Sequence, residues 1–219
     1  MELLNAMQQR HSVRAYRDIP IPEEVICRLK QEIERIEKES GLQIALCTNE
    51  PEAFSGALAH YGRFRNCKNY LAIAAEDGKE ETVGWYGEEL VLLAQSMGLN
   101  SCWVALTFRK GKVPFTPAPG KKLAIVISLG YGQTQGVPHK SKPIEKLCRW
   151  EEPIPDWFRK GMEAALLAPT AINQQRFFFT QKGRRVSAKE LTGPCSKMDL
   201  GIVKYHFALG AGQENFDWE

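Results

Sequence analysis

The sequence predicts a layered fold of the α+β or α/β class, and three observations carry that prediction. Apolar runs typical of buried strands alternate with segments whose apolar residues recur at helical spacing. The chain has 219 residues, which is long enough for one domain with a sizeable core. No stretch has the composition of a flexible interdomain linker. We therefore expect a single domain over residues 1–219.

The first third of the chain contains the clearest helix. A short apolar helix built on Leu3 and Met7 precedes it. The longer helix begins at Glu23, where acidic residues fill the first turn, and Gly41 ends it. Residues 42–47 and 70–75 are apolar runs that we predict to be strands, and we expect the region between them to be irregular apart from one short helix.

The remaining elements alternate in the same way. We expect helices over residues 83–97, 156–167 and 197–209, the first of them stopped by Gly98. We expect strands over residues 101–107, 123–129 and 176–181. Residues 110–122 form a loop rich in proline and glycine.

Composition narrows the class of protein. A formal net charge of +3 is too small to indicate nucleic-acid binding. No stretch approaches the roughly 20 apolar residues of a membrane span, and the N-terminus lacks the features of a secretory signal. The six cysteines include no CxxC pair, so we expect reduced thiols in a cytoplasmic protein with no structural metal.

The stretch of residues 168–177 is one candidate site. Pro169 has no N–H and disfavours helix at the preceding residue, so the helix before it should end near Ala168. Thr170, Asn173 and Gln175 then lie on a short connection between a buried helix and a buried strand. Such connections present ligand-binding groups on a rigid scaffold. The alternative is an ordinary polar loop.

A second candidate lies near the N-terminus, where Arg10, His11, Ser12 and Arg14 fall within five residues. Arginine offers a fixed fork of donors that matches phosphate oxygens, and serine adds a neutral donor. The alternative is a solvated basic turn.

Taken together, the two candidates resemble the nitroreductase family of flavin enzymes. That family opens with Arg-Arg-Ser-x-Arg and carries a Pro-Ser-x-x-Asn-x-Gln-Pro-Trp loop. This chain has His11 for the second Arg, Thr170 for Ser, Arg176 for Pro and Phe177 for Trp. The family's loop comes early in most members, whereas here it lies near the C-terminus, as in a divergent, rearranged branch.

Two further segments are similar to the family. One is a helix end at Gly98 followed by a strand that carries Trp103. The other joins a strand end at residues 129–132 to the sequence His139-Lys140-Ser141-Lys142-Pro143.

The resemblance implies an α+β, nitroreductase-like fold with a mostly antiparallel central sheet flanked by helices. It also implies bound FMN. Arg10, His11 and Ser12 would hold its phosphate and ribityl chain, with added charge from Lys140 and Lys142. Arg14 would lie near the pyrimidine end of the ring, where a cation tunes the flavin potential. The ring edge would be covered by Pro169, Thr170 and Asn173, and the backbone of Trp103, Val104, Ala105 and Leu106 would face N5 and O4.

The implied activity is FMN-dependent transfer of electrons from NAD(P)H to a nitroaromatic, a quinone or a similar small acceptor. No side chain need act as nucleophile or base, because the cofactor carries the chemistry. Two alternatives remain: a flavin-binding carrier or sensor without efficient turnover, and a non-flavin domain that kept the fold.

Seven residues also have a structural interpretation. Lys140 and Lys142 could belong to a solvated loop, and Trp103 could belong to the core. We expect His206 to be a half-buried, satisfied histidine. Glu88, Glu89 and Asp199 look like helix-start residues.

A faint internal repeat relates residues 1–148 to residues 149–219. Pro20-Ile21-Pro22, a helix and a strand resemble Pro153-Ile154-Pro155, a helix and a strand, and Gly87 then corresponds to Gly201. Only the first half carries the Arg-x-Ser-x-Arg pattern, and only the second carries the Pro-x-x-x-Asn loop. We therefore expect one chain to fold as its own pseudo-dimer, with one FMN per chain, and to act as a monomer in preference to a homodimer.

Overall fold

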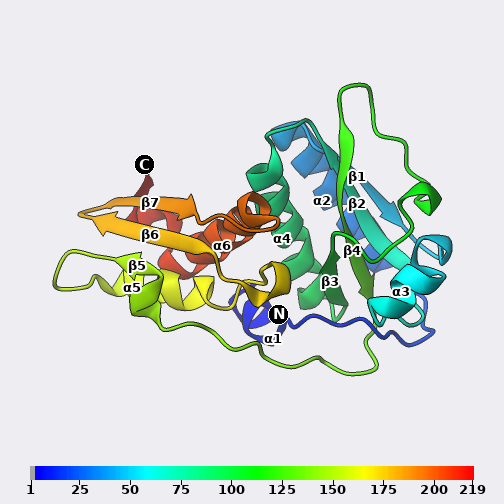
Figure 1. Cartoon of the computed structure of the whole chain (residues 1–219), viewed down its shortest axis with the longest axis horizontal. Coiled ribbons are helices and arrows are strands. Elements are labelled where there is room, and N and C mark those ends of the chain that lie inside the picture. Colours follow the sequence, from blue (N-terminus) through cyan, green and yellow to red (C-terminus); the bar gives the residue numbers. More distant parts are fainter. Residues whose placement is uncertain (1–2) are drawn as a thin grey trace. The chain divides into compact units, whose positions relative to one another are not determined.

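The computed structural model describes residues 3–219 and contains two compact units built from interleaved parts of the chain (Figure 1). Unit 1 contains the chain up to Lys79 together with Leu90–Pro138. Unit 2 contains Glu80–Glu89 and His139–Glu219. Met1 and Glu2, which open the N-terminal stretch considered for a secretory signal, lie outside the described residues. Within residues 3–219, none of the helices is long and apolar enough to cross a membrane.

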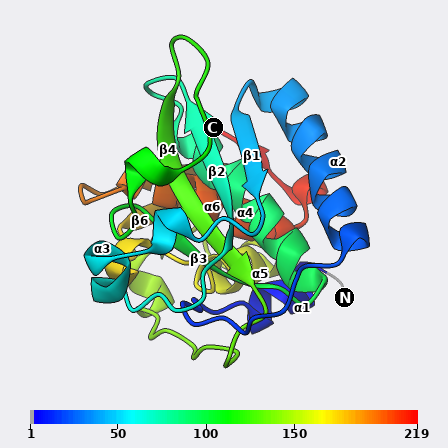
Figure 2. The ribbon, with the colours of Figure 1, turned by 90° about the vertical axis from the view of Figure 1, so that its right-hand side faces the viewer.

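Unit 1 is built on a four-stranded sheet of order β1-β2-β4-β3, in which every pair of neighbours is antiparallel. Its strands are β1 (Gln43–Cys47), β2 (Asn69–Ala75), β3 (Asn100–Val104) and β4 (Lys122–Gly130). Helix α2 (Glu23–Ser40) lies beside β1 (Figure 2) and ends where Gly41 adopts a left-handed φ of 70°. The α+β prediction with mostly antiparallel strands is confirmed.

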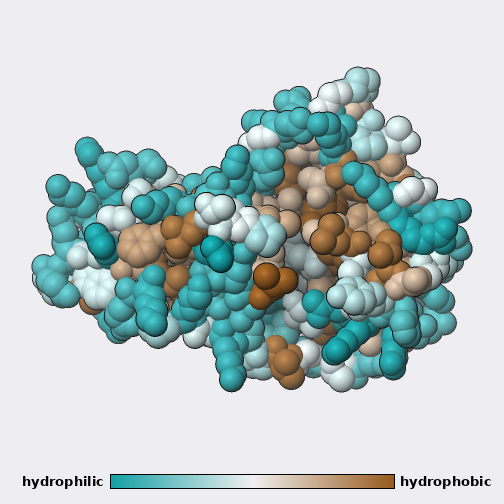
Figure 3. Space-filling model, in the orientation of Figure 1, coloured by the Kyte–Doolittle hydropathy of each residue, from teal (hydrophilic) through white to brown (hydrophobic). Residues whose placement is uncertain are grey.

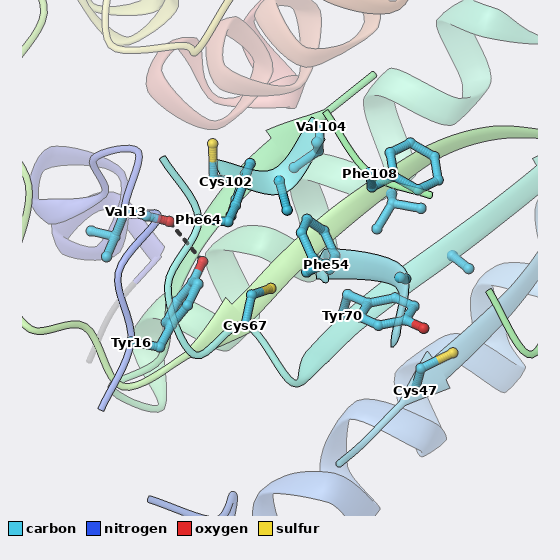
Figure 4. Close-up of a cluster of buried hydrophobic side chains, with 14 residues drawn as sticks. Val13, Tyr16, Cys47, Phe54, Phe64, Cys67, Tyr70, Cys102, Val104 and Phe108 are labelled. Carbon is cyan, nitrogen blue, oxygen red and sulfur yellow. Dashed lines mark hydrogen bonds between the residues drawn. The ribbon is translucent and has the colours of Figure 1, made fainter. Parts of the chain in front are cut away.

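The core of unit 1 is aromatic on one side of this sheet. Phe54 lies in the 3-10 helix η1 (Glu52–Phe54), and its ring is 4.8 Å from Phe64 and 5.5 Å from Tyr70. Figure 4 shows these rings gathered with Phe108 over the strands. The unit also contains α1 (Leu3–Gln9), α3 (Ala57–Tyr61), the 3-10 helix η2 (Lys110–Lys112) and the second part of α4 (Glu80–Ser96).

Unit 2 has its own four-stranded sheet, of order β5-β6-β7-β8. An antiparallel hairpin of β6 (Phe177–Lys182) and β7 (Arg185–Glu190) forms its centre, and two-residue strands pair in parallel at its edges. Those edges are β5 (Cys148–Arg149) and β8 (Asp217–Trp218). Three short 3-10 helices lie between the main elements: η3 (Ile144–Lys146), η4 (Ala171–Asn173) and η5 (Gln213–Asn215).

Two helices, α5 (Asp156–Ala165) and α6 (Ser196–Ala211), complete unit 2. The core between α6 and the sheet is a cluster of rings centred on Phe207. Its ring stacks 4.8 Å from Phe179 and meets Phe216 edge-on at 5.2 Å. Such rings bury large apolar areas, so this small sheet gains much of its stability from them.

Helix α6 also crosses the first part of α4 through two glycines. A Cβ atom at Gly84 would lie 2.0 Å from the Met198 carbonyl oxygen, and one at Gly201 would lie 2.0 Å from the Glu81 carbonyl oxygen. Gly84 thus faces the carbonyl three residues before Gly201, and Gly201 faces the carbonyl three residues before Gly84. This reciprocity is what a two-fold relation between the helices produces. It pairs Gly201 with Gly84, not with the Gly87 that the sequence pattern suggested.

Several predicted bounds were wrong. Helix α4 begins at Glu80, before residue 83, and β3 ends at Val104, before residue 107. The sequence did not indicate β7, because only Val186 of its six residues is fully buried. The edge strands β5 and β8 are too short to give a pattern.

Candidate functional site

The N-terminal donor segment (residues 10–16) follows α1 in unit 1 and lies along the edge strand β3. Ser12 pairs in parallel with Ser101, and the Val13 amide donates a 2.9 Å hydrogen bond to the Ser101 carbonyl. On its other side the segment pairs through Ala15 with Arg65. Main-chain hydrogen bonds therefore fix the path of the segment on both sides.

The buried Tyr16 ring anchors the end of this segment. Its hydroxyl donates a 2.7 Å hydrogen bond to the Val13 carbonyl and lies 2.7 Å from Ser128 Oγ in β4 (Figure 4). Burial raises the pKa of Tyr16 well above its ordinary value, so the hydroxyl keeps its proton and donates. The sequence analysis gave Tyr16 no role. Its position at the end of the donor motif was the one signal that could have indicated an anchor.

The predicted side chains of the donor segment differ in burial. Arg10 is buried at 2% exposure and His11 is half-buried, whereas Ser12 and Arg14 are exposed. A buried guanidinium supplies a fixed positive charge, and the exposed groups can meet a ligand.

The buried Cys102 thiol in β3 shows where these groups converge. Burial raises its pKa, and the opposing effects come from Arg14, Ser12 and Arg10. Arg14, Ser12 and Arg10 therefore all act on the pKa of this thiol, and Ser12 pairs with the residue just before it in β3.

The predicted flavin-facing backbone begins at that point. Trp103 is half-buried and Val104 is buried in the last pair of the ladder, opposite Val126. Ala105 and Leu106 lie beyond the strand end, and Leu106 is 83% exposed. The chain thus leaves the sheet directly after Val104 and presents its next two residues to solvent.

A loop that the sequence analysis left unassigned closes against the donor segment. Asn100, buried at the start of β3, accepts a 2.9 Å hydrogen bond from the Gly132 amide and donates one of 2.9 Å to Gln135 Oε1. A Cβ atom at Gly136 would lie 2.7 Å from His11 Cβ. An asparagine at a strand start opposite a Gly-Tyr-Gly turn could have indicated this contact.

In unit 2, the connector (residues 166–176) joins α5 to β6 and is strained. Ile172, Asn173 and Gln175 have φ angles of 49°, 55° and 47°, which side-chain-bearing residues rarely adopt. Such conformations cost about 1–3 kcal/mol each and persist only where surrounding contacts enforce them. Within the connector, Thr170 Oγ1 accepts a 3.1 Å hydrogen bond from the Gln175 amide.

Asp199 in α6 is one of the enforcing contacts. Both of its carboxylate oxygens lie 3.0 Å from the Ala171 amide, and Oδ2 accepts a 2.7 Å hydrogen bond from Gln174 Nε2. Burial raises the pKa of Asp199 to about 6, although the hydrogen bonds from Gln174 and Ala171 act to lower it. Asp199 lies in the first turn of its helix, as expected, but its carboxylate holds the connector.

The predicted lysines lie against the same connector. The Lys140 carbonyl accepts hydrogen bonds of 3.0 Å from Asn173 Nδ2 and 2.8 Å from Gln175 Nε2. The Lys142 ammonium donates to the carbonyls of Gln174 and Gln175 at 2.7 and 3.0 Å. The structure therefore brings Lys140 and Lys142 together with the connector, and two of the Lys142 donors hold its backbone.

Gln175 is the centre of this network: the sequence places it on a connection that presents ligand-binding groups, whereas the structure buries its side chain. It is 3% exposed, and besides its bond to Lys140 its Nε2 donates 2.9 Å to Asn173 Oδ1. Its Oε1 accepts 2.8 Å from the Lys142 amide. Asn173 thus has a structural role in addition to the predicted ligand-facing one.

A buried pair elsewhere in unit 2 corrects the expectation that Glu88 opens a helix. Glu88 lies in the middle of α4, fully buried, with Oε1 2.9 Å from His206 Nε2. His206 Nδ1 faces the Ala164 carbonyl at 3.1 Å and must carry a hydrogen, because a carbonyl only accepts. The Glu88–His206 contact and the Ala164 carbonyl therefore join α4, α5 and α6. His206 is fully buried, not half-buried as expected.

Neither unit contains a metal-ligand cluster: over residues 3–219, no group of three His, Cys, Asp or Glu side chains is arranged to hold an ion. All six cysteines are free thiols, and Cys27 and Cys195 are exposed. The donor segment and the connector instead offer cations, hydroxyls and amides beside apolar side chains. Such groups suit an anionic, partly apolar ligand.

Comparison with known proteins identifies relatives. The family model described as "Putative TM nitroreductase" matches residues 2–211. A crystal structure of a "putative nitroreductase" from Thermotoga maritima has 25% identity and a TM-score of 0.69, covering 98% of this chain and 85% of that one. None of the curated proteins compared with the chain matches it.

Two more distant structures share the fold. One, a "putative nitroreductase in complex with FMN" from Desulfovibrio desulfuricans, has 19% identity and a TM-score of 0.54, covering 71% of this chain and 99% of that one. The other, a nitroreductase-like protein from Streptococcus mutans, has 13% identity and a TM-score of 0.54, covering 65% of this chain and 95% of that one.

Proposed function

The chain belongs to the TM nitroreductase family, and from that membership we propose that it is an FMN-dependent oxidoreductase. It takes electrons from NAD(P)H and passes them to a nitroaromatic, a quinone or a similar small acceptor. The protein acts in the cytoplasm. When bound, FMN supplies the hydride and electron chemistry.

The observation that carries this proposal is the donor segment on the edge of β3. Arg10, Ser12 and Arg14 lie on one short segment that pairs with β3 at Ser101, so their positive charge and hydroxyl suit a phosphate and its polar chain. The backbone that leaves β3 after Val104 is available to an adjacent flat ring. This donor set fits FMN, which combines one phosphate with a large planar ring.

The connector is the second part of the proposed site. Pro169, Thr170 and Asn173 would contact the ring edge, with the exposed Lys140 side chain adding charge toward the phosphate. The strained backbone of the connector supports this role, since strain of this kind is concentrated at ligand-binding segments. Lys142 contributes mainly by holding the connector.

The alternative function is a flavin-binding carrier or sensor without efficient turnover. Anaerobic addition of NADPH or NADH to the FMN-loaded protein separates the two. An enzyme loses its flavin absorbance near 450 nm within seconds and regains it when a quinone is added. A carrier keeps its colour, and a protein that takes up no FMN contradicts both.

We also propose that one chain carries one FMN and acts as a monomer. The reciprocal contact of Gly84 and Gly201 supports this assembly, because it gives one chain a helix crossing of the two-fold type that dimers use. Light scattering with flavin quantification tests it. Mixing Arg10→Ala chains with Asn173→Ala chains is the sharper test, since restored flavin binding would mean that the site is shared between chains.

A further inference from the structure

Unit 1 carries an exposed surface that adjoins the proposed FMN site at Leu106 and extends away from it. We call it the α3 surface. Its apolar part is Leu58 and Tyr61 in α3 together with Leu106 after β3, and these side chains are 52%, 84% and 83% exposed. Exposed apolar side chains that cluster mark ligand or partner sites more often than chance exposure does. Its basic part is Arg109, Lys110 and Lys112, all exposed.

The contacts beneath this surface join its two parts. The Thr107 side chain approaches Gly62 so closely that a Cβ atom there would lie 2.6 Å from Thr107 Oγ1. The Arg109 amide donates a 2.7 Å hydrogen bond to the Ala53 carbonyl, and its guanidinium donates one of 3.2 Å to Ser55 Oγ. Residues 106–112 are therefore held against η1 and the C-terminal end of α3.

Buried rings make the floor of the surface firm. Phe108 and Phe54 are both 7% exposed, and their rings lie 6.3 Å apart. Figure 3 shows hydrophobic side chains gathered on the face of unit 1 turned to the viewer, with hydrophilic ones around them. Because the floor is already packed, a ligand that binds here must order only the exposed side chains above it and not the backbone.

The charge of this region is strongly one-sided. Residues 52–65 and 105–112 contain five Arg or Lys residues and a single acid, Glu52. A ligand that fits must combine a flat ring, able to stack on Tyr61, with several negative charges. Leu106 ends the backbone stretch proposed to face the flavin, so this ligand begins where a hydride donor must approach.

We infer that the α3 surface binds the adenosine end of the reduced dinucleotide, and that its lysines select the donor with a 2′-phosphate. The inference rests on the proposed function and narrows NAD(P)H to NADPH. The adenine ring stacks on Tyr61. The 2′-phosphate, which NADH lacks, meets Arg109, Lys110 and Lys112.

Calorimetric titration with 2′,5′-ADP and with 5′-AMP tests binding without any turnover. We expect the FMN-loaded protein to bind 2′,5′-ADP at least about tenfold more tightly than 5′-AMP. The difference should shrink when salt rises from about 20 mM to about 300 mM, because exposed phosphate contacts are screened. Steady-state kinetics should show the same preference in kcat/KM for NADPH over NADH.

Three variants locate the effect. The double variant Lys110→Gln and Lys112→Gln should weaken the binding of 2′,5′-ADP at least about fivefold. It should weaken the binding of 5′-AMP less than about twofold. Tyr61→Ala should weaken both equally, since both carry adenine. Lys30→Gln, at an exposed position of α2, is the control and should change neither.

Equal affinities for the two nucleotides, or an equal loss for both in the double lysine variant, would overturn the inference. If the protein binds FMN but prefers neither nucleotide, the proposed function stands and this inference is wrong. If the protein binds 2′,5′-ADP selectively but takes up no FMN, the nucleotide site stands and the proposed function is wrong.

Discussion

The donor segment of unit 1 and the connector of unit 2, each of which we propose as a ligand-binding segment, are held in different ways. The donor segment is fixed by main-chain hydrogen bonds to β3 and by one buried tyrosine. The connector has three residues at left-handed φ and is fixed by the side chains of Asp199, Gln174 and Gln175. A segment tied by its backbone tolerates changes of side chain, whereas one tied by side chains changes shape when a single one is lost.

This difference predicts where a substitution affects the fold and where it affects only the ligand. In the connector, stability and binding should change together, because the groups that hold its shape lie within or beside it. In the donor segment the two should separate, because the sheet edge keeps its path.

The largest effect on stability should come from Gln175→Ala. The change removes three hydrogen bonds made by a side chain that is 3% exposed, and it takes that partner from Lys140, Lys142 and Asn173. Each of these hydrogen bonds contributes about 0.5–1.5 kcal/mol, so we expect the free energy of unfolding to fall by about 3 kcal/mol. Urea unfolding measures it, and Gln133→Ala, at an exposed position of unit 1, is the control. A loss no larger than that of the control would mean that the network does not hold the connector.

Asp199→Asn should change the pH dependence of stability. The pKa of Asp199 is raised to about 6 in the folded protein, so the folded state binds this proton more tightly than the unfolded state. Its contribution is present below about pH 4 and is lost as pH rises to about 6, a change of up to about 3 kcal/mol. Unfolding free energies from pH 4 to 7 should therefore slope downward in the wild type more than in the variant. Parallel curves would contradict the buried, ionisable carboxyl.

Arg10→Ala should weaken FMN binding. Loss of a charged hydrogen bond or charge near the phosphate costs roughly 1.5–3 kcal/mol, which is about a 10- to 150-fold rise in the dissociation constant. Circular dichroism first establishes that the variant is folded, because Arg10 is buried. Arg17→Ala, an exposed arginine just beyond the segment, should bind FMN as the wild type does. If the two variants bind equally well, Arg10 is not a phosphate ligand.

The smallest effect should come from Tyr16→Phe. It removes one hydroxyl that donates to the Val13 carbonyl, while the main-chain hydrogen bonds of the segment remain. We expect a loss of about 1 kcal/mol in stability and little change in FMN affinity. Tyr61→Phe, at an exposed tyrosine, should leave stability unchanged. A large loss of FMN affinity in Tyr16→Phe would show that the sheet edge alone does not keep the segment in place.

The same contrast explains which parts of the fold could be predicted. Helix α2 was predicted within a residue because its acidic start, apolar face and Gly41 stop are all local. Helix α4 was predicted to begin at residue 83, although its acidic first turn consists of Glu80 and Glu81. Glu88 was interpreted as a helix-start residue but lies buried in the middle of α4. The partner of Glu88, His206, lies 118 residues away, and no local pattern shows such a pairing.

The candidate site divides in the same way. The residue types of the donor segment were visible in the sequence, because cations and a hydroxyl lie next to one another in the chain. The supports of the connector were not, because Asp199 and Gln175 acquire their roles from contacts across 28 and 33–35 residues. The left-handed φ angles of Ile172 and Gln175 also had no sequence indication, since neither residue favours that conformation.

Titration of the purified apoprotein with FMN, followed by flavin fluorescence, is the measurement that tests the central claim most directly. The account predicts saturable binding with one FMN per chain, and a weaker curve with the same end point for Arg10→Ala. Flavin fluorescence that rises in proportion to added FMN, with no saturable change, would contradict it. So would saturation at one FMN per two chains, because that would place a single site on a pair of chains.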